Sequence, residues 1–121
     1  MARFRACYST WFSAAMRISS HPRWSRMHGH TFSVKICVSN GELDEHGMLL
    51  DYAVLRGLVD KVVSKLDHTV LNDVLGVEDA TLEILASWIY ERLEESIRGK
   101  RLRLDFVEVC SQPDFCVEYE R

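Results

Sequence analysis

The hydrophobic period of this chain changes twice along its length, and that change constrains the fold most strongly. Residues 2–13 and 30–39 alternate between apolar and polar side chains, which is typical of strands with one buried face. Two central segments instead carry apolar residues at spacings of three and four, and residues 102–110 and 115–120 alternate again. The predicted order is therefore strand, strand, helix, helix, strand, strand.

The two central segments are predicted to be amphipathic helices. The first covers residues 52–66 with Asp51 as its N-cap, and the second covers residues 80–97 with Asp79 as its N-cap. Helices of this kind must bury their apolar stripes against another element. We therefore predict an α+β fold in which both helices cover one face of an antiparallel sheet, within a single domain of residues 1–121.

The connections between these elements differ in character. Residues 14–29 have no clean period and contain serine, proline and glycine, so we expect a long loop of the kind that often carries function. Asn40 and Gly41 follow the second strand and are a strong hairpin signal. The resulting sheet has open edge strands, and a closed oligomer is one way to cover them.

Charge and composition exclude several functions. The net charge of −3 and the scattered basic residues give no electrostatic reason to expect nucleic-acid binding. No apolar run approaches the roughly 20 residues that cross a bilayer, and the N-terminus lacks the apolar segment of a signal peptide. We expect a cytoplasmic protein that binds neither nucleic acid nor membranes.

The four cysteines, Cys7, Cys37, Cys110 and Cys116, form no closely spaced pair of the CxxC type. In a cytoplasmic chain a disulfide framework is the less expected arrangement. Three of them lie in predicted strands, where cysteine behaves as a small apolar residue. We therefore predict that the cysteines are structural, reduced side chains.

Two short segments carry groups that suit chemistry. In His28-Gly29-His30, alternate side chains of an extended segment point the same way, so two imidazoles can face one metal ion. Taken alone, this pair is as consistent with two structural histidines at the end of a strand as it is with a metal site. In Asp67-His68, a carboxylate beside an imidazole can tune a proton carrier, although taken alone such a pair is more often an acid beside a surface histidine.

Taken together and in this order, these segments resemble the family of 6-pyruvoyl-tetrahydropterin synthase and 6-carboxy-tetrahydropterin synthase over essentially the whole chain. The similar segments are Phe12-Ser-Ala-Ala15, His28-Gly-His30, Gly47-Met-Leu-Leu-Asp51-Tyr52, Leu66-Asp67-His68-Thr-Val-Leu71-Asn72-Asp73, Asp79-Ala-Thr81-Leu-Glu83 and Val107-Glu-Val109. The resemblance implies the tunnelling fold, a four-stranded antiparallel sheet with two helices in the order ββααββ. It also implies a homo-oligomer, in which trimers stack into hexamers.

The resemblance further implies a chemistry. In this family three histidines bind a zinc ion that contacts the side-chain hydroxyls of a dihydroneopterin triphosphate. A cysteine and an Asp-His pair move protons, and a glutamate near the C-terminus anchors the pterin ring. The products belong to the biopterin route or to the route to queuosine and related deazapurines.

Several of these roles match residues of this chain, and several do not. His28 and His30 match two zinc ligands, and Asp67 with His68 matches the acid–histidine pair. The position of the first zinc histidine is Met16, a soft thioether that suits Cu(I) better than zinc.

The positions of the other two functional groups are also changed. The cysteine position is Trp24, whose indole N–H only donates, and the glutamate position is Ser111. Glu108, Gln112 or Asp114 are candidates to bind the ring in its place, although strand alternation turns Glu108 away from the Val107 and Val109 side.

His21 is the candidate for the missing third zinc ligand, or else a solvated residue of the loop. We predict a divergent lyase of the tetrahydropterin synthase type, acting on a pterin-like substrate with reduced or changed activity. The alternative is a non-catalytic paralogue that binds a pterin or purine, or that partners an active homologue in an oligomer.

Overall fold

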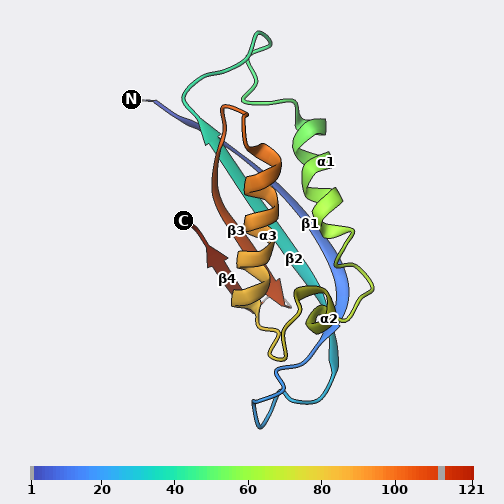
Figure 1. The fold of residues 1–121 in the computed structure, drawn as a ribbon. Coiled ribbons are helices and arrows are strands. Elements are labelled where there is room, and N and C mark those ends of the chain that lie inside the picture. Colours follow the sequence, from blue (N-terminus) through green and yellow to red (C-terminus); the bar gives the residue numbers. More distant parts are fainter. Residues whose placement is uncertain (1, 112–113) are drawn as a thin grey trace.

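The computed structural model describes residues 2–111 and 114–121. Its core is one sheet of four strands in the order β1-β2-β3-β4, and every neighbouring pair is antiparallel (Figure 1). The strands are β1 (Phe4–Met16), β2 (His28–Asn40), β3 (Arg103–Ser111) and β4 (Phe115–Tyr119). The predicted four-stranded antiparallel sheet is confirmed.

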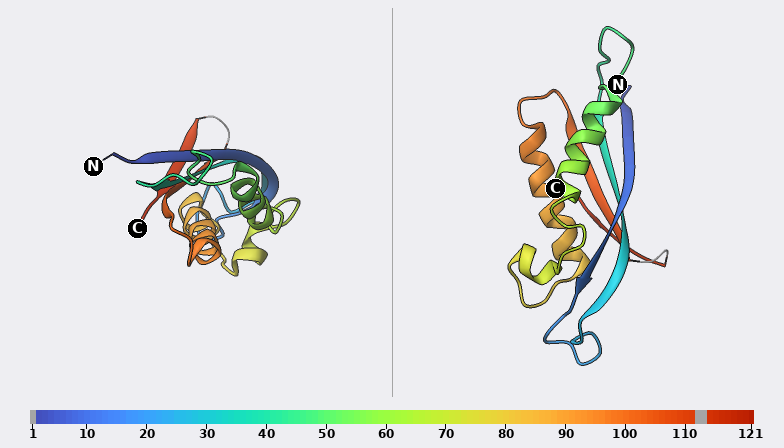
Figure 2. Two further views of the ribbon diagram at one scale, coloured as in Figure 1. Left: turned by 90° about the horizontal axis from the view of Figure 1, so that it is seen from above. Right: turned by 90° about the vertical axis from the view of Figure 1, so that its right-hand side faces the viewer.

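The helices pack together on one face of the sheet, which the two turned views show edge-on (Figure 2). They are α1 (Tyr52–Val63), α2 (Leu71–Leu75) and α3 (Leu82–Ile97). The two long helices confirm the prediction, and α2 is a single additional turn that ends at Gly76 in the left-handed conformation, with φ 68°. A five-residue helix is too short for its apolar spacing to be recognised in a sequence.

The first two strands are longer than their alternation predicts. They pair without interruption from Phe4 opposite Asn40 to Met16 opposite His28, so the connecting loop shrinks to residues 17–27. Hydrogen bonding to a neighbouring strand holds these residues extended even where their own pattern is weak. The hairpin expected at Asn40-Gly41 is wrong, because β2 is followed by residues 41–51 and then by α1.

One of the two predicted helix caps is correct. The carboxylate of Asp51 accepts a hydrogen bond from the backbone N–H of Ala53 at 2.8 Å, which caps α1. For α3 the prediction of Asp79 is wrong, since Thr81 accepts from the backbone N–H of Ile84 at 3.1 Å. Asp79 instead accepts hydrogen bonds from the backbone and hydroxyl of Ser20 and so ties the loop to the start of α3.

The core lies between the sheet and the helices. Alternate residues of β1 from Phe12 to Met16, of β2 from Phe32 to Val38 and of β3 face the helices and are almost fully buried, and the rings of Phe12 and Phe32 stack with centroids 5.1 Å apart. Each such side chain stabilises the fold by roughly 1.5–3 kcal/mol when it leaves water. Among the described residues, no helix is long and apolar enough to cross a membrane.

All four cysteines are paired in disulfides, so the prediction of reduced cysteines is wrong. Cys7 bonds to Cys37 between β1 and β2, and Cys110 bonds to Cys116 between β3 and β4. In each case the two residues are directly opposite each other in an antiparallel ladder, where side chains on one face come close. Spacing along the sequence cannot reveal a pairing that strand register creates.

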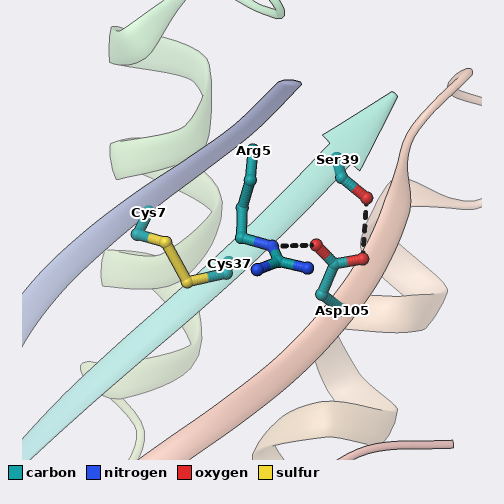
Figure 3. Close-up of a disulfide and its surroundings, with 5 residues drawn as sticks. All are labelled: Arg5, Cys7, Cys37, Ser39 and Asp105. Atoms are coloured by element: carbon teal, nitrogen blue, oxygen red, sulfur yellow. Dashed lines mark hydrogen bonds and ion pairs between the residues drawn. A yellow bond between two sulfur atoms is a disulfide. The ribbon is translucent and has the colours of Figure 1, made fainter. Parts of the chain in front are cut away.

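A buried carboxylate lies beside the first disulfide (Figure 3). Asp105 is 8% exposed and accepts hydrogen bonds from Arg5 Nε at 2.8 Å and from the Ser39 hydroxyl at 2.7 Å. Burial alone would raise the pKa of Asp105, but the bonds from Ser39 and Arg5 and the charges of Arg5 and Arg103 hold that pKa below its ordinary value.

Candidate active site

The histidine pair lies where β2 begins. His28 and His30 are opposite Met16 and Ala14 of β1, and both project on the face that carries the buried Phe32. Their ring centroids are 5.0 Å apart in an edge-to-face arrangement, and His30 also meets the ring of Phe32 edge-on at 5.7 Å. The predicted convergence of two imidazoles on one face is therefore present.

The protonation of this pair suits metal binding. His28 Nδ1 lies 2.8 Å from the backbone carbonyl oxygen of Arg26, and a carbonyl only accepts, so Nδ1 carries the hydrogen and Nε2 keeps its lone pair. Burial, and then the neighbouring charge of His28, lower the pKa of His30 below its ordinary value. At His30, burial and the charge of His28 therefore both favour the neutral imidazole that a metal ion requires.

The third ligand position does not supply nitrogen. Met16 is 4% exposed and directly opposite His28 on the same face of the sheet. Within residues 2–111 and 114–121, no group of three histidine, cysteine or acidic side chains converges at the pair. A catalytic zinc ion normally has three protein ligands. In the part of the chain that the structure describes, two histidines fit such a ligand set and no third histidine, cysteine or acidic side chain joins them.

His21 has a different environment from the pair. Its Nδ1 atom accepts hydrogen bonds from the backbone N–H groups of Arg23 at 3.0 Å and Trp24 at 3.3 Å. A neutral imidazole whose Nδ1 accepts carries its hydrogen on Nε2, so neither nitrogen offers a free lone pair. The indole of Trp24 also neighbours both His21 and His28, with ring centroids 6.4 and 5.8 Å away. The structure does not bring His21 to the pair.

The acid–histidine couple is held by the backbone of β1. Asp67 Oδ2 lies 2.9 Å from His68 Nδ1, and Asp67 Oδ1 accepts from the backbone N–H of Ser13 at 2.9 Å. The backbone N–H of His68 in turn donates to the carbonyl oxygen of Ser13 at 2.6 Å. His68 adopts the left-handed conformation, with φ 59°, which is uncommon for a residue with a side chain and clusters at functional sites.

The carboxylate of Asp67 in this couple favours its ionised form. The hydrogen bond from the Ser13 backbone, followed by that from the His68 side chain, lowers the pKa of Asp67 below its ordinary value. With Asp67 accepting from Nδ1, the lone pair of His68 is on Nε2, and the side chain is 82% exposed. This is the arrangement of a solvent-accessible general base oriented by an acid. Ser13 was not singled out by the sequence, because it acts through its backbone.

His30 and His68 open on the same depression. Its volume is about 710 Å³. The end of β1 lies between the two histidines, because it pairs with the start of β2 on one side and with the segment around His68 on the other. The residues that line it are Ser13, Ala14, Ala15, Gly29, His30, Thr31, His68, Thr69 and Val70. A hydrogen bond from the Ala15 N–H to the Thr69 carbonyl oxygen at 2.9 Å attaches the segment after His68 to β1. Two segments far apart in the sequence thus meet at one site.

The candidates for ring binding are divided between the two faces of the sheet. Ser111 is opposite Phe32 on β2, on the face of the histidines. Glu108 is opposite Lys35 on the other face, as its strand position predicts, and so lies away from the pair. Gln112 lies outside the described residues, and Asp114 is exposed.

Comparison of the whole fold places this chain in a structural class. The structure of 6-pyruvoyl tetrahydropterin synthase from Caenorhabditis elegans superposes with a TM-score of 0.86, at 22% identity, and covers 100% of this chain and 97% of that one. At that identity the likeness shows the fold, a four-stranded antiparallel sheet with helices on one face.

Sequence comparison then shows the family. The profile of 6-pyruvoyl tetrahydropterin synthase matches residues 7–121, and the chain belongs to this family. It is 36% identical over 106 residues to 6-carboxy-5,6,7,8-tetrahydropterin synthase of Synechocystis, covering 83% of this chain and 82% of the relative. It is 34% identical over 116 residues to dihydroneopterin monophosphate aldolase of Pyrococcus furiosus, covering 96% of each.

Proposed function

We propose that this protein is a lyase that cleaves the side chain of a phosphorylated dihydroneopterin. The observation that supports the proposal most directly is that His30 and His68 line one depression while Asp67 orients His68. Membership of a pterin-biosynthesis family supports the class of substrate. Among the relatives, a synthase and an aldolase both act on pterins by name, so the family accommodates more than one outcome.

An aldol-type cleavage is the reaction that these residues support best. His68 Nε2 takes the proton from the hydroxyl on the second side-chain carbon, and the bond between the first and second carbons breaks. Its electron pair moves into the adjacent C=N group of the ring, and the proton is then returned to the first carbon. The products are a hydroxymethyl dihydropterin and a two-carbon aldehyde that keeps the phosphate, and no oxidant or further reactant is needed.

One acid–base group suffices for this reaction, whereas the synthase chemistry implied by the resemblance uses a cysteine as a second carrier. At that position Trp24, 45% exposed, has an N–H that donates but does not exchange protons readily. All four cysteines are in disulfides, so no free thiol among the described residues substitutes for it. The remaining couple of Asp67 and His68 therefore favours the simpler cleavage.

His28 and His30 would hold a metal ion with two imidazoles, and the substrate hydroxyls or water would complete its coordination. When bound, such an ion would make the side-chain hydroxyl more acidic. His30 lies on the same depression as His68, so the pair would also orient the hydroxyl toward the base. Ser111, opposite Phe32 on the histidine face, would contribute a hydrogen bond to the ring.

Incubation of the purified protein with dihydroneopterin monophosphate and triphosphate tests the proposal, with products separated by chromatography. We expect formation of a hydroxymethyl dihydropterin from at least one substrate, and loss on the order of 100-fold or more in His68→Ala. His46→Ala is the matched control, since its side chain is 72% exposed in the distant loop of residues 41–51. Turnover to a carboxy- or pyruvoyl-tetrahydropterin at an ordinary rate would overturn the aldol assignment.

The second candidate is a pterin-binding protein without catalysis. The thioether of Met16 and the indole of Trp24 at two functional positions of the family favour it. Tight binding of a dihydropterin without turnover, and without any loss of affinity in His68→Ala, would support this candidate instead.

We also propose that the protein is a homo-oligomer. Of the described residues of β1, those from 4 to 12 have no strand on their outer side, and β4 is the other edge of the sheet. Pairing of these edges between copies would satisfy their backbone groups. Light scattering during size-exclusion chromatography gives the number of subunits, and a monomer at micromolar concentration would contradict the proposal.

A further inference from the structure

A second group of metal-ligating side chains lies on the face of the sheet opposite the histidines. Glu108 and Cys110 are two residues apart on β3, and Cys116 of β4 is directly opposite Cys110. One ligand atom from each of these three residues lies within 4.8 Å of the others. None of the three lines the depression of His30 and His68.

Strand register places a second carboxylate on the same face, next to the converging group of three. Glu118 is directly opposite Glu108, just as Cys116 is opposite Cys110, and the Val109–Val117 pair between them points to the other face. Alternation places all four on the same face. Once the S–S bond is broken and the two sulfur atoms can separate, two thiolates and the Glu108 carboxylate would suit a tetrahedral zinc ion, for which thiolates are preferred donors.

The state of the sulfur atoms decides whether this group can bind a metal. As a disulfide, Cys110 and Cys116 have no thiolate to offer. When a dithiol reductant donates two electrons and two protons, the S–S bond breaks, the reductant becomes a disulfide, and two thiols remain opposite each other. Loss of their protons on metal binding then gives two thiolates beside Glu108.

The other disulfide lacks these partners and provides an internal comparison. Cys37 is opposite the apolar Phe106 on β3, and Arg5 is two residues from Cys7 on the same face (Figure 3). The nearby Asp105 carboxylate already accepts hydrogen bonds from Arg5 and Ser39, and among the described residues no third metal ligand joins this pair. Both disulfides link directly opposed residues of an antiparallel ladder, and they differ in whether a carboxylate converges on their sulfur atoms.

We propose that Cys110, Cys116 and Glu108 form a redox-gated zinc site that is separate from the histidine site. In the oxidised protein the disulfide links β3 to β4, and in the reduced protein a thiolate-bound zinc ion links the same two residues. The five-residue edge strand β4 would thus stay cross-linked to β3 in both states.

Cobalt titration of the whole protein tests this proposal, because thiolate-bound Co²⁺ has a near-ultraviolet charge-transfer band that a histidine site cannot produce. The protein is reduced with a dithiol, which is then removed under nitrogen before Co²⁺ is added. We expect no band in the oxidised protein and one Co²⁺ with the band per reduced chain, displaced by one Zn²⁺.

Four variants locate the site. Cys7→Ser/Cys37→Ser is the matched control and keeps the band, as does His28→Ala/His30→Ala, which separates this site from the proposed lyase site. Cys110→Ser/Cys116→Ser loses the band, and Glu108→Gln keeps the fold while Zn²⁺ binding weakens by about 10-fold or more. Absence of the band in reduced wild-type protein, or its persistence in Cys110→Ser/Cys116→Ser, would overturn the proposal. Circular dichroism verifies that each variant is folded.

Discussion

Met16 on β1 is directly opposite His28 on β2, and its thioether is buried on the face where the two imidazoles project. The backbone therefore presents Met16, His28 and His30 on one face of the sheet, and only the two histidines offer nitrogen ligands. We therefore expect the affinity of this face for a metal ion to depend on the identity of residue 16.

Replacing Met16 by histidine should complete the ligand set. We expect Met16→His to tighten Zn²⁺ binding by more than about tenfold, or about 1.4 kcal/mol, because catalytic zinc sites use three protein ligands. Isothermal titration calorimetry on the disulfide-bonded protein measures it, with Met16→Leu as the control of similar volume. Equal affinities in Met16→His and Met16→Leu would show that residue 16 does not reach the ion.

Removal of the carboxylate that orients His68 should impair catalysis without preventing binding. Asp67→Asn keeps the shape of the side chain but removes the charge beside Nδ1, and we expect kcat to fall on the order of 100-fold with KM little changed. Steady-state kinetics on the phosphorylated dihydroneopterin that is turned over provide the measurement. A Glu45→Gln variant, in the exposed loop beside His46, should behave as wild type.

The ionisation of His30 should respond to its neighbour. Burial is the larger cause of the lowered pKa of His30, and the charge of His28 is the smaller one. His28→Gln removes only the smaller cause, so it should raise the pKa of His30 toward its ordinary value without restoring it fully. Titration of the imidazole signals by nuclear magnetic resonance reports this pKa directly. A His30 pKa that is unchanged in His28→Gln would mean that the two rings do not interact electrostatically.

The buried carboxylate beside the first disulfide should make stability depend on pH. Because the pKa of Asp105 is lowered in the folded protein, its contribution is complete above the unfolded value of about 3.9 and is lost as the pH falls through the folded value. At neutral pH we expect Asp105→Asn to cost about 1–3 kcal/mol of unfolding free energy, since Arg5 and Ser39 lose a charged acceptor.

Urea denaturation at pH 7 and at pH 3 tests that expectation, and the difference between wild type and Asp105→Asn should shrink at the lower pH. Asp73→Asn serves as the control, since Asp73 is exposed in the short helix α2. A difference that stays constant from pH 7 to pH 3 would contradict the role of the ionised carboxylate.

Local patterns in the sequence determined the four strands, the two long helices and their order. Alternation predicted the four strands, three- and four-residue spacing predicted the two long helices, and Asp51 was correctly predicted as a cap because capping involves residues that are close in the chain. The His28-Gly29-His30 and Asp67-His68 motifs were visible for the same reason, since each motif is a few residues long.

Only the tertiary structure decided which residues these motifs contact. The pairing of Cys7 with Cys37, the backbone support of Asp67 by Ser13, and the shared depression of His30 and His68 all depend on the register between strands. Register is set by packing of the whole sheet against the helices, because a shift by one residue would turn every buried side chain to the other face. No short segment of this sequence contains that information.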